Sequence, residues 1–145
     1  MEKTLYIDAE GCILGRLASV IAKRLLEGYT VFVVNAEKAI VSGKPKMVIE
    51  AYKKLFEVTT HRNPERSGIR RRRMPSAILK ETVRGMLPYR KPHGRQALKK
   101  LKVYEGIPEE LAGKNFIKIP EASASKLQAK YITLKELAKE LGWRG

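Results

Sequence analysis

The segment from His61 to Lys102 constrains this chain more than any other feature, because it carries most of the net charge. It holds fourteen Lys or Arg and two acids, which gives +12 of the net +15. The residues outside it are nearly balanced, with sixteen basic and thirteen acidic side chains. Like charge at this density is repulsive unless a polyanion lies against it, and phosphate backbones are the usual polyanion because their neutralisation releases counterions. The charge pattern therefore predicts a surface that binds nucleic acid.

Length and composition limit the remaining possibilities. A chain of 145 residues fits one domain with a real core, and a hydrophobic content of 43% argues against wholesale disorder. The sequence has no apolar run long enough to span a membrane, and its N-terminus lacks the apolar stretch of a signal peptide. The single cysteine, Cys12, excludes an intrachain disulfide framework. We expect a soluble, cytoplasmic, single-domain protein with no membrane partner.

The N-terminal part of the chain shows the periodicities of alternating strands and helices. A short β-type run spans Leu5 to Ile7, and apolar residues recur at helical spacing from Leu14 to Leu26. "TVFVVN" is a continuous β-branched and aromatic run, typical of a central parallel strand buried on both faces, and "KAIVSG" either extends it or adds a short neighbour. A further helix begins at Pro45, and its apolar face comprises Val48, Ala51, Tyr52, Leu55 and Phe56. These patterns predict a right-handed βαβ unit with helices packed on a sheet, complete within Met1 to Phe56.

The basic segment divides into a loop and two short helices. Residues 59–73 contain turn-forming pairs and four consecutive arginines, which predicts a long exposed loop. A helix follows from Pro75-Ser76 to Leu87, and its inward positions are Ile78, Leu79, Val83, Met86 and Leu87. Lys80 and Arg84 fall on its outer face. After the helix-breaking Pro88, Pro92 and Gly94, a second helix places Leu98 and Leu101 on one side and Arg95, Lys99 and Lys102 on the other.

The C-terminal part contains a brief strand at "KVYEG" and a final helix that begins at a capping box from Thr133 to Glu136 and closes at Gly142. No internal repeat or linker is visible. We therefore expect one domain over residues 1–145, composed of a βαβα core at 1–58, a basic RNA-binding loop and helices at 59–102, and a C-terminal strand and helix region at 103–145.

The cluster from Arg70 to Arg73 has two interpretations. By itself it is compatible with a solvated loop or a localisation signal. Here two helices with exposed basic stripes follow it, so we interpret the whole as one binding surface, since the planar arginine fork suits phosphate. The candidate RNA-binding residues predicted from charge are Arg62, Arg66, Arg70, Arg71, Arg72, Arg73, Lys80, Arg90, Lys91 and Lys102.

Aromatic residues are sparse in the basic segment. Tyr89 lies among basic residues, and the sequence leaves open whether it contacts RNA or packs locally.

Patterns for metal binding, catalysis and cofactor binding are missing from the sequence. His61 and His93 are far apart, with no second cysteine beside them, so no metal site is predicted. No nucleophile motif occurs, "EGCILGRLA" lacks the spacing of a dinucleotide fingerprint, and "SGKP" lacks that of a phosphate loop. We interpret Gly11, Gly15 and Gly43 as turn glycines and expect no cofactor.

"VRGMLPYRKPHGRQALKKLKVYEG", from Val83 to Gly106, resembles the signature of the universal large-subunit ribosomal protein family numbered thirteen. "IDAEGCILGRLAS" and "VVNAEKAIVSGKP" are similar to the N-terminal strand–turn–helix and second strand of that family. "HRNPERSGIRRRRMPSAIL" and "YITLKELAKELGW" are closer to the archaeal and eukaryotic branch than to bacterial members. The resemblance covers most of the chain.

The resemblance implies a three-layer α/β/α fold of the α/β class, with a small, mostly parallel sheet and a basic loop and helical extension. It also implies a structural constituent of the large ribosomal subunit that binds large-subunit rRNA beside neighbouring ribosomal proteins, without catalysis. Residues placed at or near rRNA by the motif match are Arg84, Gly85, Arg95, Lys99 and Lys100. Met86, Leu87 and Leu101 would be packing residues.

Two other classes of function are alternatives. An RNA-modifying enzyme with a Rossmann-like sheet would need a cofactor crevice, which the glycine patterns do not support. A DNA-binding regulator would need a recognition helix that reads base edges, but the helix from Ser76 to Leu87 exposes little besides Lys80 and Arg84.

Overall fold

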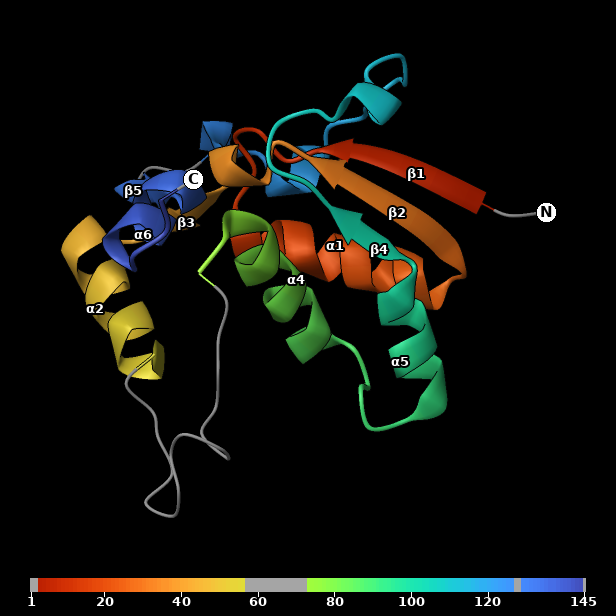
Figure 1. Ribbon diagram of the computed structural model, residues 1–145, viewed down its shortest axis with the longest axis horizontal. Coiled ribbons are helices and arrows are strands. Elements are labelled where there is room, and N and C mark those ends of the chain that lie inside the picture. The colour runs from red at the N-terminus through yellow and green to blue at the C-terminus, as the bar shows by residue number, and fades with distance from the viewer. Residues whose placement is uncertain (1–2, 57–72, 127–128, 145) are drawn as a thin grey trace.

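The computed structural model describes residues 3–56, 73–126 and 129–144. The chain has an α/β fold with a small, mostly parallel sheet, as predicted (Figure 1). Its helices and strands, in chain order, are β1 (Lys3–Asp8), α1 (Leu14–Leu26), β2 (Tyr29–Val34), β3 (Ile40–Ser42), α2 (Pro45–Phe56), α4 (Pro75–Met86), α5 (Pro92–Lys99), β4 (Leu101–Val103), β5 (Tyr131–Thr133) and α6 (Leu134–Glu140). Short 3₁₀ turns lie between them at η1 (Ala36–Lys38), η2 (Glu109–Leu111), η3 (Pro120–Ala122) and η4 (Ala124–Lys126).

The main sheet has three strands in the order β1-β2-β4, and both pairings are parallel. β2 is central, as its unbroken apolar sequence predicts, and α1 connects it to β1 in a βαβ unit. In register, Tyr6 of β1 lies beside Phe32 of β2, which lies beside Lys102 of β4. The brief strand expected near "KVYEG" is therefore the edge strand that completes this sheet.

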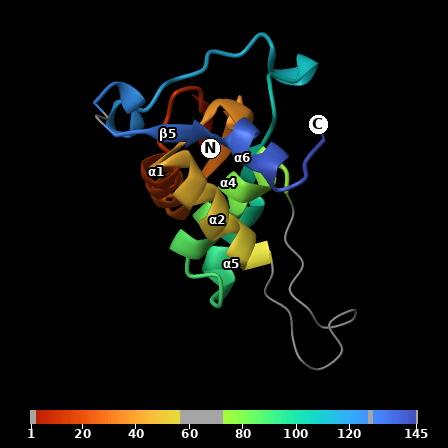
Figure 2. The same ribbon diagram turned by 90° about the vertical axis from the view of Figure 1, so that its left-hand side faces the viewer.

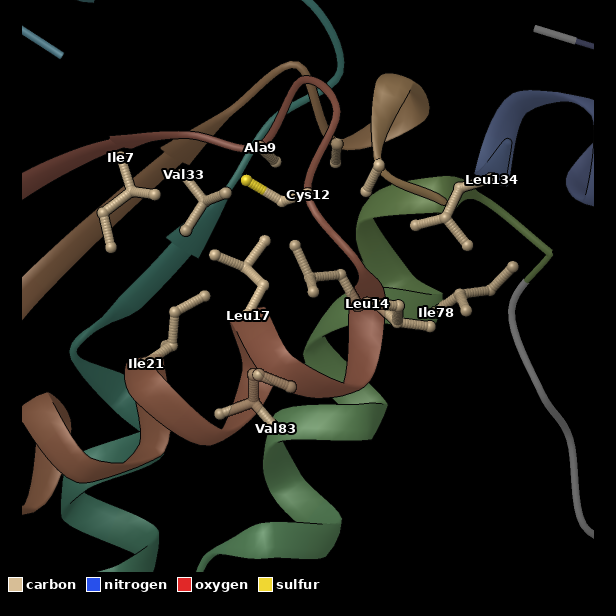
Figure 3. Packing of buried hydrophobic residues seen from close by; sticks show 14 of the residues in the cluster. Ile7, Ala9, Cys12, Leu14, Leu17, Ile21, Val33, Ile78, Val83 and Leu134 are labelled. Carbon is tan, nitrogen blue, oxygen red and sulfur yellow. The ribbon is translucent and has the colours of Figure 1, made fainter. Parts of the chain in front are cut away.

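Helix α1 provides the centre of the core. Its bounds agree with those predicted, and the buried side chains are Leu14, Leu17, Ala18, Ile21, Ala22 and Leu25. Figure 3 shows Leu17 and Ile21 between the sheet residues Ile7 and Val33 and the α4 residue Val83. The helix ends before Gly28, whose φ of +98° is readily adopted only without a side chain. Helical spacing alone was enough to predict this element.

Helices α4 and α5 complete the same core. Both contact α1 and β4, and Figure 1 shows all three helices on one side of the sheet. Leu79, Val83 and Leu101 are fully buried there. The prediction of a complete core within Met1 to Phe56 is therefore wrong, because α4 and α5 of the basic segment pack on α1 and share its core.

The opposite face of the sheet is covered more sparsely. Tyr6 stacks on Phe32 with ring centroids 5.3 Å apart, and Phe116 packs edge-on against Tyr6 at 6.2 Å. All three rings are half-buried. Burial of β2 on both faces is therefore only partly correct: Val31, Val33 and Val34 are enclosed, but Phe32 is not.

A second, antiparallel sheet pairs β3 with β5 and lies beside α6. Helix α2 packs on β5 and α6 (Figure 2), so the sheet that it contacts is the second, antiparallel one. Its expected apolar face is correspondingly shallow, and 43% of Leu55 is exposed. The predicted cap of α6 is present, since Thr133 Oγ1 accepts a hydrogen bond from the Glu136 backbone at 3.2 Å.

Two further residues differ from expectation. Met86 is 44% exposed, because α4 ends there and the chain becomes extended at Leu87, which turns inward instead. Gly15 lies within α1 and is not a turn glycine, whereas Gly11 and Gly43 have φ values of +72° and +126°, as turn glycines do. Among the described residues, no helix is long and apolar enough to cross a membrane.

Candidate nucleic-acid interface

Helix α4 presents two different faces. It begins with Pro75, whose missing N–H costs nothing in the first turn, and the Ser76 backbone donates to Glu105 Oε1 at 2.9 Å in place of a side-chain N-cap. Its buried residues are Pro75, Ile78, Leu79 and Val83. Lys80, Arg84 and Gly85 are exposed on the other side. Packing therefore fixes the orientation in which α4 presents its cations.

The turn between α4 and α5 is fixed by a close backbone contact. A Cβ atom at Gly94 would lie 2.1 Å from the carbonyl oxygen of Pro88, so only glycine permits this approach. Gly94 and Ala97 form the buried side of α5. Arg95 and Lys99 consequently point away from the core and are exposed.

A groove of about 390 Å³ lies between these two helices. Lys80 of α4 and Arg95 and Lys99 of α5 supply its cations. The other lining residues are Tyr89, Pro92, Gln96 and Leu98. A smaller hollow of about 210 Å³ beside β4 shares Lys80 and adds Lys102 and Tyr104, so the two hollows adjoin at Lys80.

The charge of this surface has little local compensation, since Glu81 of α4 is the one acid between residues 73 and 104. Between residues 82 and 103 the chain has seven Lys or Arg and no Asp or Glu. Among residues 3–56, 73–126 and 129–144, no ion pair joins Lys80, Arg84, Arg95 or Lys99 to a carboxylate. Arg84 instead places its guanidinium carbon 4.1 Å from the centroid of the Tyr89 ring. The arrangement suits an anionic partner with several phosphates.

The structure exposes most of the described candidate residues on the segment from α4 to β4. These residues are Lys80, Arg84, Gly85, Arg90, Lys91, Arg95, Lys99, Lys100 and Lys102. Of these, Lys80, Arg95 and Lys99 meet at the groove. Arg73 lies apart, beside Gly142 after the last helix. Arg62, Arg66, Arg70, Arg71 and Arg72 lie outside the described residues.

Sequence reasoning missed part of the groove. It left the role of Tyr89 open and did not identify Gln96, although Gln96 shares the polar side of α5 with Arg95 and Lys99. The sequence signal for Gln96 was therefore present. No sequence signal placed Tyr89 at the groove, since its position depends on the turn that Gly94 permits.

Other parts of the molecule offer less chemistry. No group of three His, Cys, Asp or Glu within the described ranges is arranged to hold a metal ion. A hollow of about 460 Å³ is lined by the segments around Cys12 and Pro120. Burial raises the pKa of the Cys12 thiol above its ordinary value, so it remains protonated and is a poor nucleophile.

Comparisons with known proteins show the family of this chain. The family described as Ribosomal protein L13 matches residues 2–110. A protein of Saccharolobus solfataricus named large ribosomal subunit protein uL13 is 50% identical over 99% of this chain and 96% of its own length. Proteins of the same name from Sulfolobus acidocaldarius and Aeropyrum pernix are 52% and 46% identical, over 97% and 99% of this chain and 95% and 92% of their own lengths. The extent of these matches, together with the α/β fold and the basic surface, shows that the chain belongs to the ribosomal protein L13 family.

Proposed function

We propose that this protein binds large-subunit rRNA through the surface formed by α4, α5 and β4, and that it stabilises the folded RNA without catalysing a reaction. Membership of the L13 family makes it a structural, non-enzymatic protein of the large ribosomal subunit, and therefore cytoplasmic as part of the ribosome. The family assignment displaces the two alternatives, an RNA-modifying enzyme and a DNA-binding regulator. We further propose contacts with neighbouring large-subunit proteins.

The observation that carries this proposal is the row of uncompensated cations. Each of Lys80, Arg84, Arg95 and Lys99 is exposed and without a carboxylate partner among the described residues. Free cations in such numbers repel one another, and neutralising phosphates relieves that repulsion while releasing counterions from the RNA. The apolar sides of both helices are buried in the core, so the surface is held in place before RNA arrives.

We extend the interface to the arginines that precede α4. Arg62, Arg66, Arg70, Arg71 and Arg72 immediately precede this helix in the chain, and Arg73 is exposed at its start. Their proposed role rests on sequence position and charge. The proposed place of Gly85 at or near rRNA rests on the family motif, and the space beside it is open, since no atom lies within 4 Å of a Cβ built there.

Salt-dependent binding tests the proposal. On duplex DNA, six to ten phosphate contacts lose roughly 10³–10⁵ in affinity between 50 and 200 mM salt, and folded RNA is expected to show a similar or smaller slope. Replacing both Arg84 and Lys99 with Ala should weaken binding to large-subunit rRNA and flatten the slope by about one unit for each lost contact.

The matched control replaces Lys46 and Lys53 with Ala. Both lysines are exposed on α2, which Figure 1 shows well away from α5. Their replacement removes the same net charge as the Arg84/Lys99 double substitution. The control protein should keep the salt slope of the wild type. If the Arg84/Lys99 variant also kept that slope, the RNA-binding surface would have to lie elsewhere.

A further inference from the structure

Tyr89 occupies an unusual place in the interface. Its ring borders the groove between α4 and α5, and the guanidinium of Arg84 lies against it at 4.1 Å although Arg84 does not line the groove. The side chain of Tyr89 is 38% exposed. The residue lies in the turn whose backbone is held by the close contact between Gly94 and Pro88. A partly solvent-accessible ring is thus presented beside cations that have no carboxylate partner among the described residues.

The remaining lining supplies the other groups that a nucleotide needs. Pro92 and Leu98 add apolar surface, and Gln96 carries an amide that both donates and accepts hydrogen bonds. Lys80 and Lys99 are placed to neutralise phosphate. The volume of about 390 Å³ falls in the range of small-molecule sites. A phosphate backbone alone would use the cations but neither the ring nor the amide.

We propose that the groove binds one unpaired RNA base, which stacks on Tyr89, while Lys80 and Lys99 hold the adjoining phosphates and Gln96 contacts the edge of the base. This inference rests on the proposed rRNA-binding function and specifies what that surface recognises. Proteins read RNA mainly at unstacked bases, which stack on aromatic rings or arginine planes. The guanidinium of Arg84 lies 4.1 Å from the ring centroid, and this cation–π contact favours the observed position of the ring.

The first experiment compares Tyr89→Leu with Tyr89→Phe in binding to large-subunit rRNA. Loss of one base–aromatic stack should weaken binding roughly 5- to 150-fold. The salt slope should stay unchanged, because no phosphate contact is removed. Tyr89→Phe keeps the ring and should bind more tightly than Tyr89→Leu. The control is Tyr131→Leu, since Tyr131 is exposed on β5, away from α4 and α5.

The same series separates stacking from a merely structural role. If Tyr89 only positioned Arg84, then Tyr89→Leu would flatten the salt slope as Arg84→Ala does. The variant with both substitutions would then bind rRNA no more weakly than either single variant. Thermal unfolding of each variant shows whether the fold is retained. A flattened slope in Tyr89→Leu would overturn the proposed stacking.

The second experiment uses a short, fully paired RNA duplex and the same duplex with one unpaired adenosine. The wild type should bind the bulged RNA more tightly, and Tyr89→Leu should lose that preference. Equal binding of both RNAs by the wild type would overturn the base-binding inference, but a steep salt dependence would still support the proposed function. If neither RNA nor large-subunit rRNA were bound in a salt-dependent way, the proposed function itself would fail.

Discussion

Helices α1 and α4 are of similar length and pack against each other, yet they face different surroundings. On their inner sides they are alike, since each buries aliphatic side chains such as Leu17 or Leu79 with no exposed area. On their outer sides each carries an arginine close to a tyrosine ring. Arg24 lies 5.9 Å from Tyr29, and Arg84 lies 4.1 Å from Tyr89.

The difference between them is a carboxylate. Arg24 pairs with Glu27 at 3.0 Å, whereas Arg84 forms no ion pair within the described residues, although Glu81 lies three residues before it. A surface ion pair contributes little to stability, but it neutralises the charge that would attract phosphate. Two helices can therefore both pack into the core while, under the proposed function, only α4 offers cations to RNA.

The largest expected effect tests whether the inner sides are equivalent. Leu17→Ala and Leu79→Ala should each lower the free energy of unfolding by about 2–5 kcal/mol, through lost burial and the cavity left behind. Urea unfolding measures both. A cost below about 1 kcal/mol for Leu79→Ala alone would mean that α4 is an appendage and not part of the core.

The second test concerns the backbone of the basic surface. Gly94→Ala should cost about 1–3 kcal/mol or more, because the new Cβ meets the Pro88 carbonyl and α5 must move. It should also weaken rRNA binding by disturbing the groove. The matched variant Gly85→Ala meets no atom within 4 Å and should stabilise α4 by up to about 1 kcal/mol. Equal thermal shifts for the two variants would contradict the close contact at Pro88.

The third test compares the outer sides directly. Arg24→Ala and Arg84→Ala should each change stability by no more than about 0.5 kcal/mol, since both residues are exposed. Only Arg84→Ala should flatten the salt slope of rRNA binding, by about one unit. Matching losses in binding from both variants would show that the ion pair with Glu27 does not distinguish the helices.

The smallest effect is expected at the end of α4. Met86→Ala should change the free energy of unfolding by about 0.5 kcal/mol or less, because the side chain is 44% exposed. Its neighbour in sequence, Leu87, is buried, and Leu87→Ala should cost more. Calorimetric unfolding of the two variants would reveal a larger loss for Met86→Ala if that side chain were packed in solution.

The helices were predictable to different degrees. The bounds and buried residues of α1 follow from helical spacing, because its apolar stripe faces one continuous core. The same spacing failed at Met86, since periodicity does not show where a helix stops and the chain reverses. For α2 it indicated an apolar side but not the partner, which proved to be β5 and α6.

The sequence by itself determined the α/β class, the central position of β2, the amphipathic helices and the excess of cations over residues 61–102. Each of these depends on local spacing or composition, which is present in the chain before it folds. Tertiary structure decided what distant segments do together: β3 pairs with β5, the basic helices close the core over α1, and Tyr89 meets the cations of α4 and α5 at one groove. These contacts depend on the path of the whole chain. At α5 they also depend on Gly94, because a Cβ atom there would lie 2.1 Å from the carbonyl oxygen of Pro88.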